Sequence, residues 1–237
     1  MKKIPIYPLT QLERYLENDY NMFLTHLIRR YPDYSKIAKQ STGYKILDNS
    51  LAELGEAMSL RVVLDTAERI DADEIVLPDV FMRGEATLTQ IRNSIHMFKE
   101  DLKKYSVMAV IHGETVEEVE RVYQEVIAIN EVDVLGIPKV WEKQFKEEGG
   151  RSEILKRLVE NFGTNNKEIH LLGIWNDLKE LEKYKDCDYI RSVDSSLFTI
   201  SEMMNGKTKR PNKITLDLES GEFVTDNKIV IEAERNV

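Results

Sequence analysis

The chain has 237 residues, of which 42% are hydrophobic and 32% are charged, as in a soluble globular protein with one substantial core. Its formal net charge of −9 argues against simple nucleic-acid binding, which usually leaves a basic footprint. The single cysteine excludes an internal disulfide and a thiolate zinc site. Since no apolar run predicts a membrane span or a signal peptide, we expect a cytoplasmic protein with no membrane partner.

Short apolar runs alternate with helical patterns along the chain. Six runs predict buried strands, at residues 44–48, 74–79, 107–112, 132–138, 169–174 and 189–194. A seventh strand is predicted at 22–28, and residues 4–8 are one candidate for the eighth. Helices are predicted at 9–19, 51–69, 87–105, 115–129, 151–162, 178–184 and 197–204. Thr10 with Glu13, and Thr115 with Glu118, match the capping-box pattern at a helix start.

This alternation predicts parallel strands joined by right-handed crossovers. We therefore expect an α/β fold, a somewhat irregular TIM-type (β/α)8 barrel, over residues 1–212. Residues 214–218 and 228–231, separated by turn residues 219–222, predict a β-hairpin. Residues 213–237 would then form a C-terminal hairpin extension.

Three of the predicted strands end in an acid: Asp48, Asp79 and Asp194. Because barrel chemistry collects at the carboxyl ends of strands, we expect these carboxylates to face one site. Carboxylates around one cavity have pKa values that spread apart, so one can act as nucleophile and another as proton carrier. Capping is the alternative: Asp194 or Ser195 could cap the helix that starts near Leu197, and Asn49 or Ser50 could cap the helix after Asp48.

Other strand ends carry a histidine or a glycine. His112 could bind substrate or a metal, or could be a packed core residue, and Gly113 would let a ligand approach the backbone. Gly136 and Gly173 lie late in apolar strands, where a missing side chain often marks the close approach of another group. His170 lies earlier in its strand, and we expect it to be structural.

One segment near the C-terminus is strongly basic. It is a candidate for nucleic-acid binding, and a solvated loop is the alternative. Its cations are Lys207, Lys209, Arg210 and Lys213.

Together, these segments of residues 44–204 resemble the tRNA-guanine transglycosylase superfamily, whose members exchange a purine base in nucleic acid for a 7-deazaguanine. Residues 46–50 are similar to the family segment in which Asp-Ser-Gly-Gly supplies an acid at the reacting base, although the glycines are missing here. Residues 72–79 resemble the segment whose closing Asp recognises the guanine edge. Residues 110–113, 135–137 and 170–174 stand at the family's Gln-Gly pair, its glycine-rich base-binding loop and its Leu-Met-Gly-Val strand. Residues 189–195 align with the strand that bears the nucleophilic Asp.

The resemblance implies roles for these residues. Asp194 would attack C1′ of a guanosine nucleotide, Asp48 would transfer protons, and Asp79 would accept hydrogen bonds from the base edge. No metal and no cofactor would be required. The further substrate contacts would come from His112, Gly113, Gly136, Ile137, Leu172, Gly173, Asn49 and Ser50.

Two departures from the family bear on the substrate. The tRNA enzymes are longer and carry a Cys/His zinc subdomain, which one cysteine cannot supply. The chain looks more like the compact branch found in phages and bacterial modification clusters, which inserts queuosine-related 7-deazaguanines of the preQ0 type into DNA. The resemblance therefore implies DNA rather than tRNA as the partner, and the host cytoplasm if a phage encodes the protein. The acidic charge also makes a partner protein worth considering.

Two other hypotheses stay open on the sequence alone. One is a different barrel enzyme, either a Schiff-base lyase that uses Lys139 or a metal hydrolase that uses Asp48, Asp79 and His112. The other is a non-catalytic barrel that binds a 7-deazaguanine or a nucleic acid.

Overall fold

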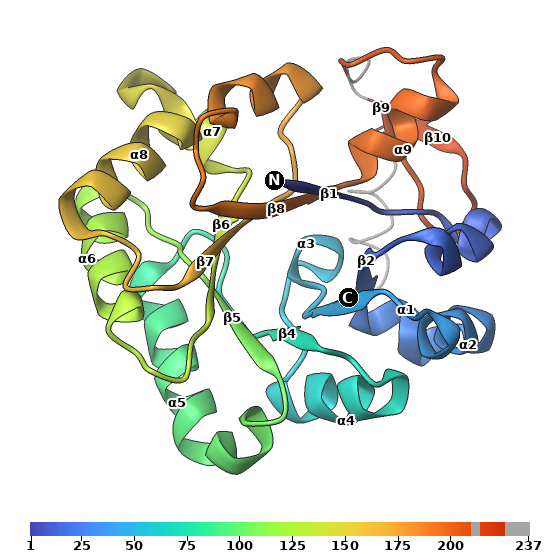
Figure 1. Ribbon diagram of the computed structural model, residues 1–237, viewed down its shortest axis with the longest axis horizontal. Coiled ribbons are helices and arrows are strands. Elements are labelled where there is room, and N and C mark those ends of the chain that lie inside the picture. The colour runs from blue at the N-terminus through green and yellow to red at the C-terminus, as the bar shows by residue number, and fades with distance from the viewer. Residues whose placement is uncertain (210–213, 226–237) are drawn as a thin grey trace.

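The computed structural model describes residues 1–209 and 214–225 (Figure 1). Eight parallel strands form one sheet in the order β1-β8-β7-β6-β5-β4-β3-β2. The two edge strands, β1 and β2, are neighbours in space, so the sheet is a nearly closed TIM-type (β/α)8 barrel. The strands are β1 (Lys2–Pro5), β2 (Tyr20–Leu24), β3 (Tyr44–Asp48), β4 (Glu74–Val76), β5 (Ser106–Val110), β6 (Val134–Pro138), β7 (Glu168–Leu172) and β8 (Ile190–Ser195).

Helices follow the strands and surround them as an outer ring (Figure 1). The α-helices are α1 (Thr25–Arg30), α2 (Pro32–Gln40), α3 (Leu51–Leu54), α4 (Leu60–Ile70), α5 (Gly84–Leu102), α6 (Val116–Ile127), α7 (Trp141–Gln144), α8 (Gly150–Phe162) and α9 (Ser196–Met203). The 3₁₀ helices are η1 (Leu9–Glu17), η2 (Lys146–Glu148) and η3 (Leu178–Tyr184).

Most strands are largely apolar because both of their faces are buried, although β1 starts with two exposed lysines and β4, β7 and β8 carry polar side chains. On β5, Val107 and Ala109 pack in the outer core between strands and helices, whereas Met108 and Val110 point into the barrel. The same alternation on the other strands fills the barrel interior. Its buried members are Ile4, Ile6, Met22, Ile46, Val76, Met108, Val110 and Val134.

The start of the chain differs from the prediction. The predicted strand at 22–28 is β2 only as far as Leu24, and Thr25 begins α1, so His26 lies on a helix. The Thr25 hydroxyl donates a hydrogen bond to the Asp48 carbonyl oxygen (2.5 Å), a tertiary contact that no local pattern reveals. The eighth strand is β1, which begins two residues before the predicted segment at 4–8.

The helix predictions were right in type and wrong in some boundaries. The predicted helix at 51–69 is divided into α3 and α4, with Gly55 ending α3 at a φ of 77°. The Thr10 capping box was wrong, because η1 follows Pro8 without a side-chain cap. The Thr115 cap is confirmed, with its hydroxyl accepting from the Glu118 N–H at 3.2 Å.

A C-terminal antiparallel hairpin is present, formed by β9 (Ile214–Leu216) and β10 (Phe223–Thr225). Its second strand therefore starts earlier than predicted, and the predicted segment at 228–231 lies outside the described residues. The Leu9 N–H donates to the Leu218 carbonyl oxygen (2.7 Å), and the Leu218 side chain packs on the barrel interior. The hairpin thus contributes to the open end of the barrel.

Within the described residues, no helix combines the length and the apolar character that crossing a bilayer requires.

Candidate active site

The carboxyl ends of the strands surround a cavity of about 810 Å³. Side chains of the barrel interior, among them Met22, Val76 and Val110, form its apolar floor. Of the predicted site residues, those that line it are Asp48, Asn49, Asp79, His112, Leu172, Gly173 and Asp194. The topology thus brings all three predicted acids to one cavity.

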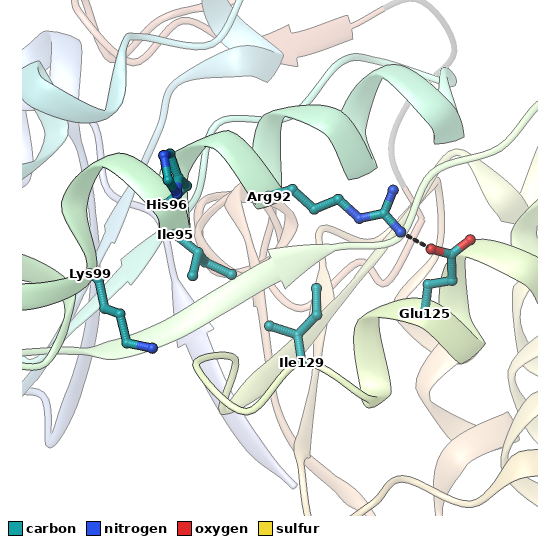
Figure 2. A pocket seen from close by; sticks show the side chains of 6 residues that line it. All are labelled: Arg92, Ile95, His96, Lys99, Glu125 and Ile129. Atoms are coloured by element: carbon teal, nitrogen blue, oxygen red, sulfur yellow. Dashed lines mark hydrogen bonds and ion pairs between the residues drawn. The ribbon is translucent and has the colours of Figure 1, made fainter.

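A smaller hollow of about 360 Å³ lies on the outer surface between α5 and α6 (Figure 2). Arg92 and Glu125, which face each other across it, form an ion pair. Lys99 at its edge pairs with Glu131 (2.8 Å). These exposed charges neutralise each other, and no predicted site residue lies here. We therefore interpret the hollow as an ordinary helix–helix groove.

Asp194 is held by one oxygen of its carboxylate. Oδ1 accepts from the His170 Nε2 and from the Gly173 N–H, both at 3.0 Å. Oδ2 makes no hydrogen bond with the described residues, and the side chain lines the cavity. Asp194 is not the cap of α9, since the Ser195 hydroxyl accepts from the Leu197 N–H (3.1 Å). The arrangement fixes the carboxylate and leaves one oxygen for chemistry.

Gly173 can place its N–H against Asp194 because it lacks a side chain. Its φ of 71° lies in the left-handed region, and an added Cβ would come within 2.7 Å of Lys139. The predicted importance of a glycine late in β7 therefore has a local physical basis.

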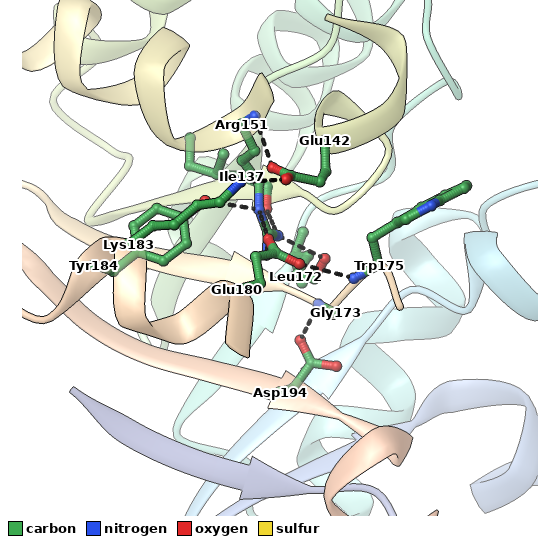
Figure 3. A network of polar contacts seen from close by, with 10 residues as sticks. All are labelled: Ile137, Glu142, Arg151, Leu172, Gly173, Trp175, Glu180, Lys183, Tyr184 and Asp194. Atoms are coloured by element: carbon green, nitrogen blue, oxygen red, sulfur yellow. Dashed lines mark hydrogen bonds and ion pairs between the residues drawn. The ribbon is translucent and has the colours of Figure 1, made fainter. Parts of the chain in front are cut away.

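A buried ion pair shapes the loop that contains Gly173 (Figure 3). The fully buried Arg151 donates to Glu180 through Nε (3.0 Å) and to the carbonyl oxygens of Ile137 (3.2 Å) and Leu172 (3.4 Å). The other Glu180 oxygen accepts from the Trp175 N–H at 3.0 Å. One guanidinium thus ties together the ends of β6 and β7 and the loop after β7.

Asp48 lies across the cavity at the end of β3. Its Oδ2 accepts from the Ser50 N–H at 2.6 Å. Burial, and then the negative charges of Glu53, Asp194 and Asp79, hold the pKa of Asp48 well above its usual range, against this hydrogen bond. Asp48 is therefore suited to carry a proton where Asp194 is suited to carry a charge.

Glu53 on α3 is a cavity residue that the sequence analysis missed. Burial by the surrounding protein raises the pKa of its carboxyl, and the charge of Lys139 opposes that rise. The side chain nevertheless stays accessible to water in the cavity mouth. A lone glutamate on a short helix gives no sequence signal of this placement.

Asp79 is oriented by two neighbours that the sequence analysis had placed in the site. The Asn49 side-chain amide donates to its Oδ1 at 2.7 Å, and His112 Nε2 lies 2.7 Å from its Oδ2. The Met82 N–H donates to His112 Nδ1 (3.3 Å), so the ring proton is on Nε2 and points at Asp79. Asn49 also accepts from the Leu51 N–H (2.9 Å), as the predicted cap of the next helix would.

Four predicted substrate contacts lie outside the cavity lining. Ser50 is buried, with its hydroxyl accepting from the His26 N–H (3.1 Å). An added Cβ at Gly113 would meet Val119, and one at Gly136 would meet Leu172 and Met108. Ile137 packs in the outer core. These four residues support the walls of the cavity.

His170 was expected to be structural, and it is buried outside the cavity lining, where it also contacts the predicted nucleophile. Its ring is fully buried inside the barrel. The signal that could have found it is the period of two along a strand, which puts His170 and Leu172 on the same inward face.

The predicted basic segment is only partly described. Lys207 and Lys209 are exposed, and their neighbour Thr208 accepts through its carbonyl oxygen from the Leu178 N–H (2.9 Å). This places the two lysines beside the loop after β7, at the cavity end of the barrel. The other two predicted cations, Arg210 and Lys213, lie outside the described residues.

Over residues 1–209 and 214–225, no group of three or more His, Cys, Asp or Glu side chains is placed to hold a metal ion. The sequence matches no known family model and no curated protein.

Glu180→Gln should lower the free energy of unfolding by about 3 kcal/mol or more, because it leaves the buried Arg151 charge without its counter-charge. Urea denaturation measures this. The matched control is Glu182→Gln on the same 3₁₀ helix, where the side chain is exposed and we expect a change within about 0.5 kcal/mol. Equal effects of the two substitutions would contradict the central role of the pair.

Asp48→Asn should raise the thermal unfolding midpoint at pH 8. The folded-state pKa of Asp48 lies above its unfolded value of about 3.9, so ionisation of Asp48 destabilises the fold as pH rises through this window. The increase in the unfolding midpoint should become smaller as pH falls towards about 4, where Asp48 of the unfolded chain also binds the proton. Thermal melts at several pH values test this, with the exposed Asp188→Asn as control. A loss of stability at pH 8 would contradict the assignment.

Proposed function

We propose that this protein is a base-exchange glycosyltransferase that replaces guanine in a nucleic acid, DNA in preference to tRNA, with a 7-deazaguanine of the preQ0 type. The observation that carries the proposal is the pair of unlike carboxylates in one cavity. Asp194 has one oxygen fixed by two donors and the other open to the cavity, and Asp48 has its pKa raised. Such a pair fits a nucleophile and a proton carrier.

The first half-reaction would use both carboxylates. Asp194 Oδ2 attacks C1′, and the bond between C1′ and N9 of guanine breaks. The electron pair of that bond goes to N9, which takes the proton held by Asp48. The result is a covalent ester between Asp194 and C1′, with free guanine.

The second half-reaction would reverse these roles. The ionised Asp48 removes the proton from N9 of the incoming 7-deazaguanine, and N9 attacks C1′. The ester bond to Asp194 breaks, and its electron pair returns to the carboxylate. Both acids are restored, so the cycle needs no redox step.

The cavity also suits a planar base. Its volume of about 810 Å³ is within the range of roughly 300–1,000 Å³ typical of small-molecule sites. Leu172 and Val76 offer apolar surface to a ring face. Asp79, with its carboxylate held by Asn49 and His112, offers a preoriented acceptor to the N–H groups of a guanine edge.

Features of the rim support a nucleic acid as the carrier of that base. Phe81 lines the cavity and is 53% exposed, so its ring is accessible at the cavity mouth. Trp175 lines it as well, with Lys143 Nζ 5.8 Å from its ring centroid. Aromatic faces next to cations bind unstacked bases, and a base must leave the duplex to reach such a cavity.

Base exchange tests the proposal. The protein is incubated with guanine-containing DNA, single- or double-stranded, or with tRNA, together with labelled guanine or a 7-deazaguanine. Label should enter DNA, and Asp194→Ala should reduce incorporation by at least roughly 10³-fold because the nucleophile is gone. The exposed Asp188→Ala is the matched control and should retain exchange.

The other outcomes decide against parts of the proposal. Incorporation into tRNA alone would keep the chemistry and overturn the substrate. Binding of a 7-deazaguanine without exchange into either nucleic acid would favour a non-catalytic barrel. Borohydride trapping at Lys139 would favour a Schiff-base enzyme.

A further inference from the structure

A series of polar side chains, joined by hydrogen bonds, crosses the barrel interior from β4 to Asp194. It begins at the fully buried Glu74, whose two oxygens accept from Arg191 Nη1 (2.7 Å) and Nη2 (2.9 Å). Arg191 Nε donates to the Ser192 hydroxyl oxygen at 3.2 Å. The Ser192 Oγ lies 2.8 Å from His170 Nδ1, and His170 Nε2 lies 3.0 Å from Asp194 Oδ1.

The strand geometry is irregular where this series crosses it. The pairing of β7 with β8 steps from Ile169–Ile190 to His170–Ser192, so Arg191 has no partner in the ladder. Such a bulge re-aims side chains and is common next to active sites. Here it puts Ser192, rather than Arg191, opposite His170 and leaves Arg191 free to reach Glu74.

Only one assignment of donors and acceptors to the hydrogen bonds between Arg191 and Asp194 leaves the His170 ring neutral. A guanidinium has no acceptor, so the Ser192 oxygen must accept from Arg191. The Ser192 hydroxyl proton is then free to point at His170 Nδ1, which accepts it. The Asp194 carboxylate can only accept, so the ring proton of a neutral His170 sits on Nε2 and is donated to Asp194 Oδ1, which leaves Nδ1 as the acceptor.

Arg191, at the other end of this series of hydrogen bonds, is held in its charged form. Burial disfavours the charged form of Arg191, but the hydrogen bonds and charge of Glu74 outweigh this, and the pKa of Arg191 is raised. The two-point contact with Glu74 also fixes the plane of the guanidinium and hence the direction of Nε.

We propose that Arg191 and Ser192 are positioning residues that set the tautomer of His170 and, through it, the orientation of Asp194. This inference rests on the proposed function in giving Asp194 the role of nucleophile. A neutral His170 with its proton on Nε2 binds Oδ1 without giving up that proton. Asp194 thus keeps Oδ1 on fixed donors, with Oδ2 turned to C1′, and leaves as a carboxylate when the ester breaks.

Nitrogen NMR of the histidine rings tests the tautomer without any reaction. The chain has four histidines, so ¹⁵N-histidine labelling gives a simple spectrum that His170→Gln can assign. Wild-type His170 should show one protonated and one bare nitrogen, with the proton on Nε2. In Ser192→Ala the Nδ1 signal should shift, because Nδ1 loses the hydroxyl that lies 2.8 Å from it, whereas Nε2 keeps its contact with Asp194.

Kinetics test the consequence. Ser192→Ala should lower kcat for base exchange by roughly 10- to 100-fold, the usual effect of removing an outer partner of a site residue, with KM changed less than about 2-fold. Ser192→Thr keeps the hydroxyl and should recover most of the rate. Ser94→Ala, at a buried serine on α5, is the matched control and should change neither readout.

The positioning role of Arg191 and Ser192 and the proposed base exchange can each be overturned without the other. A wild-type His170 with its proton on Nδ1, or one unchanged in Ser192→Ala, overturns the inference even if exchange is observed. An Nε2–H tautomer with an Nδ1 signal that depends on Ser192, in a protein that exchanges no base, sustains the series of hydrogen bonds and overturns the function proposed for Asp194.

Discussion

The site of this barrel depends on one constraint: a buried guanidinium must place all of its N–H donors on acceptors. Arg151 meets this demand outside the strands by binding Glu180 and the carbonyl oxygens at the ends of β6 and β7. Arg191 meets it inside the barrel by binding Glu74 and the Ser192 hydroxyl. Each satisfied cation fixes a segment that touches Asp194, through the Gly173 N–H in one case and His170 in the other.

The three carboxylates that converge on the cavity repel one another when they are ionised, and this repulsion opposes folding. Asp48, Asp79 and Asp194 converge on one apolar-floored space, so ionisation of one carboxylate disfavours ionisation of the next. Asp48 shows the effect as a raised pKa, whereas Asp194 and Asp79 are each held by two donors. Unlike environments for chemically identical side chains are what a reaction with one nucleophile and one proton carrier requires.

The sequence was enough to predict the barrel and the convergence of the three acids, because both follow from strand period and from parallel topology. It could not predict that Thr25 begins a helix, since a short apolar run fits a strand and a buried helix equally well. His170, Glu53 and the bulge that skips Arg191 depend on contacts between distant segments and on register. The supporting roles of Gly113 and Gly136 were likewise visible only once their neighbours were in place.

The central claim is that Asp194 forms a bond to C1′, and the most direct measurement is the site of that bond. The protein is mixed with a guanine-containing oligonucleotide without an incoming base, denatured in acid and digested, and the adduct is located by peptide mass spectrometry. The account predicts an oligonucleotide that has lost guanine, esterified to Asp194, and no adduct in Asp194→Asn. An adduct on Asp48 or Asp79, or base exchange that proceeds with no adduct at all, would contradict it.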